Sequence, residues 1–225
     1  PPKAHERACL GDHTLEYGQH MTERRFLFRW AAGALVLAGC GVLAACSEQG
    51  AKFQGVDVSQ SNYAQELPLA DHNGQQRRLQ DFRGKAVVVF FGYTQCPDVC
   101  PTSLQELVEA KQLLGAEGER LQGIFVTVDP ERDTAELLKA YVENFDPSFL
   151  ALRGSPEQLA AVAKDFKIYY KKVPGSTPTS YTMDHSAGSY VYDPAGRLRV
   201  YHRYGSGAQA LASDVRLLLQ EKTTP

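Results

Sequence analysis

From about residue 66 onward, the apolar residues follow two patterns, one typical of strands and one typical of helices. Residues 86–91 form an unbroken apolar run, rich in β-branched and aromatic side chains and bounded by Gly84 and Gly92, which predicts a buried strand. Residues 123–128 and 149–152 predict two more strands. After residues 101, 134 and 155 the apolar positions recur every three or four residues, which predicts amphipathic helices.

Two antiparallel hairpins and a last helix complete the pattern. Residues 66–79 contain an Asn-Gly turn at positions 73–74 and predict the first hairpin. Residues 189–204, with a turn at 193–196, predict the second, and Leu211, Val215 and Leu218 mark the inner face of the closing helix. This order of strands and helices is typical of a thioredoxin-like α/β domain.

The chain before residue 46 has a different character. After Met21, three arginines (positions 24, 25 and 29) precede an apolar stretch, residues 31–45. Its length of about 15 residues suits a signal peptide better than a membrane-spanning helix, which needs about 20. We therefore predict that residues 1–20 lie upstream of the true start, that 21–45 are a signal peptide, that 46–62 are a polar tether, and that 63–225 are the folded domain.

Two cysteines near the end of this leader, Cys40 and Cys46, follow the triplets LAG and LAA. Both sites resemble the bacterial lipobox, in which the cysteine is lipidated and becomes the mature N-terminus. Cys46 is preferred because a longer apolar run precedes it and polar residues follow. The prediction is a protein anchored by lipid on the periplasmic side of the bacterial cell membrane. An ordinary cleaved signal, an uncleaved anchor and twin-arginine export are the alternatives left open.

Composition and charge narrow the function classes. The chain has 225 residues, of which 43% are hydrophobic and 22% charged, as expected for one well-filled globular domain. The net charge of −2 gives no basic surface for nucleic acid. Of the five cysteines, Cys9 falls in the upstream segment and two fall in the leader, so the predicted domain keeps only Cys96 and Cys100.

Cys96 and Cys100 lie where a predicted strand ends and a predicted helix begins, since Pro101 suits the first turn of a helix. Four residues of spacing place both thiols on one helical face, near enough to form a disulfide or to bind one soft metal ion. Backbone N–H groups and the helix dipole would favour the thiolate there. A purely structural disulfide is the weaker alternative, because so short a loop constrains the unfolded chain little.

A third ligand would have to come from the three histidines of the predicted domain. We interpret His72, in a hairpin turn, as solvated, and His202, on an alternating strand, as a surface residue. His185 lies in a polar loop just before a predicted strand. In a thioredoxin-like fold the segment entering that strand abuts the cysteine loop, so His185 is the candidate.

Three motifs now stand out in order: FGYTQCPDVCP (residues 91–101), VDPERD (128–133) and DHS (184–186). Together they strongly resemble the Sco/SenC family of copper proteins, which act in cytochrome c oxidase assembly, over roughly residues 55–222. The resemblance implies a thioredoxin-like fold, with a central mixed sheet flanked by helices and an added N-terminal β-hairpin. It also implies a copper site made of Cys96, Cys100 and His185. Asp129 is a candidate neighbour of that site, or else a turn residue before the following helix.

The chemistry of these donors agrees with copper. Soft thiolates select Cu(I), and an imidazole completes a three-coordinate site, whereas structural zinc normally needs four protein ligands. The family's function would be that of a metallochaperone, with copper as Cu(I) and with Cu(II) as a second state. Its partners would be the CuA-bearing oxidase subunit, the membrane, and a periplasmic copper donor or thioredoxin-like reductant.

Two alternatives remain open at this point. One is a thiol–disulfide oxidoreductase that keeps the CuA cysteines reduced, or a thiol peroxidase. The other is a copper or redox sensor that hands no copper on. A dedicated thioredoxin-type reductant normally has the spacing C-x-x-C, and this chain has C-x-x-x-C with a histidine, which favours copper binding over enzymatic activity.

Overall fold

The apolar run predicted as a buried strand lies in the middle of an eight-stranded mixed sheet, in the order β1-β10-β9-β4-β5-β6-β2-β3. Every residue of β4 is buried. It pairs in parallel with β5 and antiparallel with β9, and β5 pairs in parallel with β6. The computed structural model describes residues 52–177 and 180–221. The strands of the large sheet are β1 (Val56–Asp57), β2 (Leu69–Asp71), β3 (Gln76–Arg77), β4 (Ala86–Gly92), β5 (Leu121–Thr127), β6 (Leu150–Arg153), β9 (Ser189–Tyr192) and β10 (Leu198–His202).

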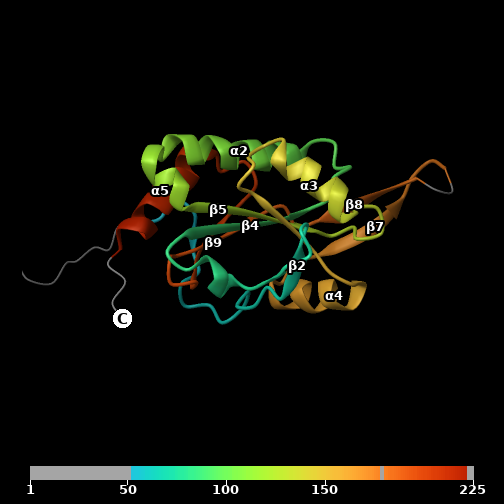
Figure 1. Cartoon of the computed structure of the whole chain (residues 1–225), viewed down its shortest axis with the longest axis horizontal. Helices are drawn as coiled ribbons and strands as arrows, with labels where there is room; N and C mark the ends of the chain where they lie inside the picture. The colour runs from blue at the N-terminus through green and yellow to red at the C-terminus, as the bar shows by residue number, and fades with distance from the viewer. Residues whose placement is uncertain (1–51, 178–179, 222–225) are drawn as a thin grey trace, which may run out of the picture. The chain divides into compact units, whose positions relative to one another are not determined.

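Helices cover both faces of the sheet, with α2, α3 and α5 on one face and α4 on the other (Figure 1). Side-chain caps explain where two of them begin. Thr134 accepts from the Leu137 N–H at the start of α3, and Ser155 accepts from the Gln158 N–H at the start of α4. The helical elements are η1 (Leu79–Phe82), α2 (Val99–Leu113), η2 (Gly115–Arg120), α3 (Ala135–Glu143), α4 (Pro156–Asp165) and α5 (Ala208–Gln220).

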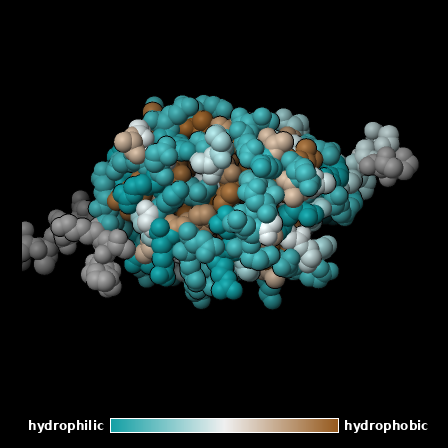
Figure 2. All heavy atoms as spheres, in the orientation of Figure 1, coloured by the Kyte–Doolittle hydropathy of each residue, from teal (hydrophilic) through white to brown (hydrophobic). Residues whose placement is uncertain are grey.

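The thioredoxin-like fold with its added N-terminal hairpin is confirmed. β2 and β3 form the hairpin, whose turn includes Gly74 at a φ of +81°, a conformation that glycine adopts without strain. β2 also pairs with β6, so the hairpin extends one edge of the sheet. Figure 2 shows a face that is mainly hydrophilic, with hydrophobic side chains visible between the polar ones near its middle.

The folded part of the chain starts before residue 63. β1 pairs with β10, and the N–H groups of Gln54 and Gly55 donate to the Asp214 carboxylate at 2.7 and 2.8 Å. Residues 56 and 57, within the segment interpreted as a tether, are therefore part of the sheet. The predictions for residues 1–51, including lipidation of Cys46, lie outside the described residues. Among the residues described, no helix has the length and apolar character needed to cross a bilayer.

One element differs in kind from the prediction. The segment around His185 is expected to be a loop, yet it is the strand β8 (Tyr181–His185), which pairs with β7 (Tyr170–Pro174). These two strands form a separate ribbon that projects from the body of the domain at the right of Figure 1. Residues of β8 alternate between half-buried and exposed, so Tyr181, Met183 and His185 share the inner face.

Candidate metal centre

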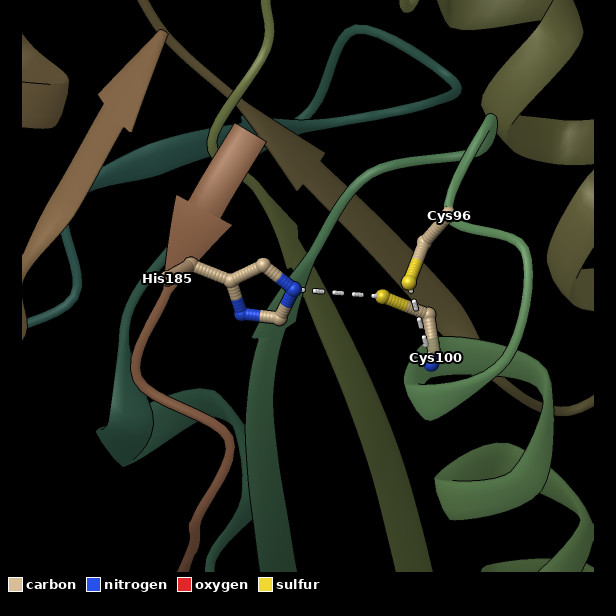
Figure 3. A group of neighbouring side chains, drawn as sticks. All are labelled: Cys96, Cys100 and His185. Carbon is tan, nitrogen blue, oxygen red and sulfur yellow. Dashed lines mark hydrogen bonds between the residues drawn. The ribbon is translucent and has the colours of Figure 1, made fainter. Parts of the chain in front are cut away.

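The two cysteines come from the loop between β4 and α2 and from the first turn of α2. Cys96 is half-buried on the loop, whereas Cys100, the second residue of α2, is buried. Both thiols are free. The Cys100 backbone N–H points back to Cys96 Sγ at 3.4 Å, which fixes the loop sulfur over the start of the helix (Figure 3).

Gly92, the last residue of β4, makes room for the buried sulfur. A Cβ atom at this position would lie 2.7 Å from Cys100 Sγ and 2.8 Å from the Phe125 ring. Both distances are shorter than side chains tolerate without moving. The glycine of the motif therefore lets the thiol lie directly against the end of the central strand.

His185, at the end of β8, brings the third donor. Its Nε2 lies 3.5 Å from Cys100 Sγ, and its Nδ1 lies 3.0 Å from the Ser186 carbonyl oxygen. A carbonyl can only accept, so Nδ1 carries the proton and Nε2 presents its lone pair to the sulfurs. The ring also packs edge-on against Phe90 and Tyr93, with centroid distances of 6.2 and 5.8 Å.

The donor atoms of Cys96, Cys100 and His185 all lie within 4.8 Å of one another. Figure 3 shows the three side chains pointing toward one another, from the cysteine loop, from α2 and from β8. Within the described part of the chain this is the one such group of at least three cysteine, histidine or acidic donors. Two sulfurs and one imidazole form a soft, three-donor set, which suits Cu(I) better than a closed four-ligand zinc site.

Burial sets the protonation of the site in the metal-free protein. It lowers the pKa of His185, which keeps the imidazole neutral, as a metal ligand must be. It also raises the pKa of the Cys100 thiol well above its usual range. The expected stabilisation of a thiolate by the helix N-terminus is therefore wrong for Cys100, because desolvation of the buried sulfur outweighs the dipole.

Asp129 lies beside the group without touching any of the three donors. Its carboxylate pairs with Arg132 and accepts from the Tyr181 hydroxyl at 2.9 Å, and only 3% of its side chain is exposed. Its own N–H donates to Thr127 Oγ1. Asp129 thus reaches the site through Tyr181, on the strand that carries His185, and through Arg132.

The carboxylate that holds the cysteine loop is Asp133, which the sequence interpretation passed over. It is fully buried and accepts from the Thr94 N–H at 3.1 Å, from Thr94 Oγ1 at 2.6 Å and from Thr127 Oγ1 at 2.6 Å. Burial raises its pKa. Its place in the VDPERD motif was the available clue, because that motif carries two aspartates and only the first was considered.

The other two histidines are buried, so both earlier interpretations are wrong. His72 is 8% exposed, and its Nδ1 accepts from the Ala151 N–H at 3.2 Å. His202 is 4% exposed and pairs through Nε2 with Asp214 at 2.8 Å. The partner of His72 lies on β6, far away in the sequence, and the partner of His202 lies on the helix α5. The local pattern of polar and apolar residues does not reveal either partner.

Several known proteins are similar to this chain in sequence. A family model described as SCO1/SenC matches residues 57–220. The "Protein SCO2 homolog, mitochondrial" of Bos taurus is 38% identical over 191 residues, covering 81% of this chain and 72% of that protein. The protein of the same name in Mus musculus is 38% identical over 153 residues, and the chain spans 60% of its length.

Solved structures agree in fold. The Bradyrhizobium japonicum ScoI with copper bound is 38% identical, with a TM-score of 0.62, covering 68% of this chain and 97% of that one. BsSco, described as a member of the Sco family of cytochrome c oxidase assembly proteins, is 23% identical, with a TM-score of 0.55, covering 71% of this chain and 95% of that one. At that identity the second likeness establishes the fold alone.

Proposed function

The chain belongs to the SCO1/SenC family, and from that premise we propose that it is a copper-binding metallochaperone, which delivers copper to the CuA centre during cytochrome c oxidase assembly. The observation that carries the proposal is the convergence of two sulfurs and one imidazole nitrogen within 4.8 Å. Copper in the related ScoI supports the choice of metal.

Each donor has a distinct part in this function. Cys96 is half-exposed and is the sulfur through which an ion enters or leaves. Cys100 and His185 hold the ion from the buried side, and uptake releases the Cys100 proton because only the thiolate binds. Three ligands with one accessible sulfur suit a carrier, since an incoming thiolate or imidazole of the acceptor can attach before the carrier's own ligands leave.

Anaerobic titration with Cu(I) in competition with a chromophoric chelator tests the binding step. The expected result is one Cu(I) per chain, lost or greatly weakened when Cys96 or Cys100 is replaced by alanine. His72→Ala, which removes a buried histidine far from the donors in the fold, is the matched control and should bind as the wild type does. No Cu(I) uptake by the wild type would overturn the proposal.

Transfer is tested separately by mixing copper-loaded protein with the apo form of a CuA domain. The chaperone should give up its copper and generate the CuA absorption spectrum. A copper sensor would bind the metal and fail to transfer it, so this result would replace delivery by sensing.

A thiol–disulfide oxidoreductase is the second candidate, because both thiols are free and their sulfurs lie within 4.8 Å of each other. Burial raises the pKa of Cys100, which leaves half-exposed Cys96 as the attacking thiol. His185→Ala separates the two functions: a dithiol reductant keeps most of its activity, whereas a copper carrier loses most of its affinity.

For location, we propose that Cys46 is lipidated and that the domain is held on the periplasmic side of the bacterial cell membrane, near its copper donor or reductant. The lipobox-like LAAC sequence supports this. In cells given a labelled fatty acid, Cys46→Ser should abolish labelling and Cys40→Ser should not. The reverse pattern would move the anchor to Cys40, and no labelling of the wild-type protein would exclude a lipid anchor.

A further inference from the structure

The ribbon that carries His185 pairs with no other strand of the described chain. An isolated two-stranded ribbon is at best marginally stable in water, so contacts with the body of the domain must hold it in place. His185 must nevertheless stay within bonding distance of two sulfurs that belong to a different element. Some group therefore has to join the ribbon to the cysteine loop.

Arg132 makes such a link. Its Nη1 donates to Gln95 Oε1, next to Cys96 on the loop, and to the Tyr181 carbonyl on β8, both at 3.0 Å. One guanidinium nitrogen thus bridges the two segments that supply the metal ligands. The planar fork of arginine makes this bridge with Nη1 while its Nε pairs with Asp129, an arrangement that the single nitrogen of lysine cannot reproduce.

A stack and an ion pair hold the guanidinium against Tyr181. Its central carbon lies 3.6 Å from the centre of the Tyr181 ring, within the range of a cation–π interaction. Its Nε pairs with Asp129, and Asp129 in turn accepts from the Tyr181 hydroxyl. Asp129, Arg132 and Tyr181 therefore form a closed set of contacts, in which the aspartate binds both of the others.

These contacts position the Arg132 side chain more than they stabilise the fold. Arg132 is 20% exposed, and its Nη2 is buried without an acceptor among the described residues. A buried donor without a partner costs stability. A side chain kept at this cost, between the two ligand-bearing segments, indicates a role in the site itself.

We propose that Arg132 is a positioning residue that controls how fast copper leaves the protein, by clamping the His185 strand against the cysteine loop. The inference rests on the proposed function, since its cargo is Cu(I) held by Cys96, Cys100 and His185. Without the clamp the ribbon moves away more often, the imidazole leaves with it, and the ion remains on two thiolates that an acceptor displaces more easily.

The test measures the rate at which excess chelator removes Cu(I) from the loaded protein. Arg132→Met should release copper about tenfold faster, the effect of losing roughly one charge-assisted hydrogen bond. Arg132→Lys, which keeps the charge and loses the fork, should fall between Arg132→Met and the wild type. It also serves if Arg132→Met does not fold.

Lys172→Met is the matched control. Lys172 Nζ lies 3.9 Å from the centre of the same Tyr181 ring and 2.7 Å from Glu131, but both charged side chains are largely exposed. Exposed pairs contribute little, so its release rate should stay within about twofold of the wild type. Equal acceleration in Lys172→Met would mean that losing any cation beside the Tyr181 ring suffices, which overturns the clamp.

A double variant separates positioning from general destabilisation. If Arg132 acts through His185, Arg132→Met should add nothing to the release rate in a His185→Ala background. The same acceleration in that background, or a wild-type rate in Arg132→Met alone, would overturn the proposal.

Hydrogen exchange in the metal-free protein tests the clamp independently of copper. Residues 181–185 should exchange faster in Arg132→Met than in the wild type or in Lys172→Met. Unchanged exchange counts against the clamp, whereas failure of the wild type to take up Cu(I) counts against the proposed function alone.

Discussion

His185 and His202 occupy equivalent positions in their strands but contact different kinds of partner. Each is the last residue of its strand, β8 or β10. In each the Nε2 atom faces a partner: Cys100 Sγ at 3.5 Å for His185, and the Asp214 carboxylate at 2.8 Å for His202. The two sites differ in the chemistry of that partner and in the sheet that carries the histidine.

The difference teaches what makes a buried histidine available to a metal. Asp214 already accepts from two backbone N–H groups as well as from His202, so this carboxylate ties the start of the domain to α5. His185 instead faces two soft sulfur atoms, those of Cys96 and Cys100. It also lies on the free ribbon, whereas His202 lies in the eight-stranded sheet. The proposed ligand is on the less integrated strand and the structural histidine on the more integrated one.

The largest expected effect separates the two histidines by metal affinity. His185→Ala should weaken Cu(I) binding about 100-fold or more, because it removes one of the three proposed ligands, and loss of an outer-shell partner alone costs 10- to 100-fold. His202→Ala should bind Cu(I) within about twofold of the wild type. Chelator competition measures both, and similar losses in the two variants would erase the distinction.

The converse effect concerns stability. His202→Ala leaves the Asp214 carboxylate without one of its three donors, which should lower the free energy of unfolding by about 2 kcal/mol. His185→Ala in the metal-free protein should cost less, about 1 kcal/mol, since it removes a weak contact with a thiol, one hydrogen bond to a neighbouring carbonyl and some edge-on ring packing, but leaves no buried charge without a partner. Urea unfolding gives both values, and a larger loss for His185→Ala would contradict the assignment.

A smaller effect tests the sulfur side of the comparison. Gly92→Ala places a Cβ atom 2.7 Å from Cys100 Sγ and should weaken Cu(I) binding about tenfold, as the sulfur is pushed from its place. Gly123→Ala on β5 is the matched control, since its Cβ would meet Phe149 at 2.7 Å and no sulfur. It should cost stability and leave affinity unchanged, whereas equal losses of affinity would show that crowding of the sheet alone is responsible.

The smallest effect is the pH dependence of the unfolding free energy that comes from Asp214, the partner of His202. Burial alone would raise the pKa of Asp214, but hydrogen bonds from His202 and from the N–H groups of Gln54 and Gly55 lower it overall. The carboxylate therefore stabilises the fold fully above about pH 4 to 5, and this contribution is lost as the pH falls through its lowered pKa. The difference in unfolding free energy between wild type and Asp214→Asn, about 1 kcal/mol at pH 7, should vanish toward pH 2. A difference that persists at low pH would place the stabilisation elsewhere.

The local sequence carried much of the fold. An apolar run rich in β-branched and aromatic residues and bounded by glycines predicts the buried β4, and an Asn-Gly pair between short extended segments gives the β2–β3 hairpin. The cysteine pair was evident from its position between strand and helix. His185 came from the DHS motif and from the topology of the fold, since one histidine in a polar segment carries little information alone.

The features that could not be predicted from the sequence depend on contacts between distant segments. His202 alternates like a surface residue, and only the packing of α5 brings Asp214 to it. Residues 181–185 form a strand because they pair with β7. Their polar composition does not predict that pairing. The pKa of Cys100 follows from how much protein covers the sulfur, and no motif encodes that.

The chain separation between Cys100 and His185, 85 residues, has a consequence for the timing of metal capture. Covalent spacing keeps the two thiols near each other even in an unfolded chain, but the imidazole reaches them only after the central sheet has closed and the ribbon has docked. An unfolded chain therefore holds the two sulfurs of this site together without the imidazole of His185. The complete three-donor group exists only in the folded domain, so copper bound by all three donors would report a folded chain.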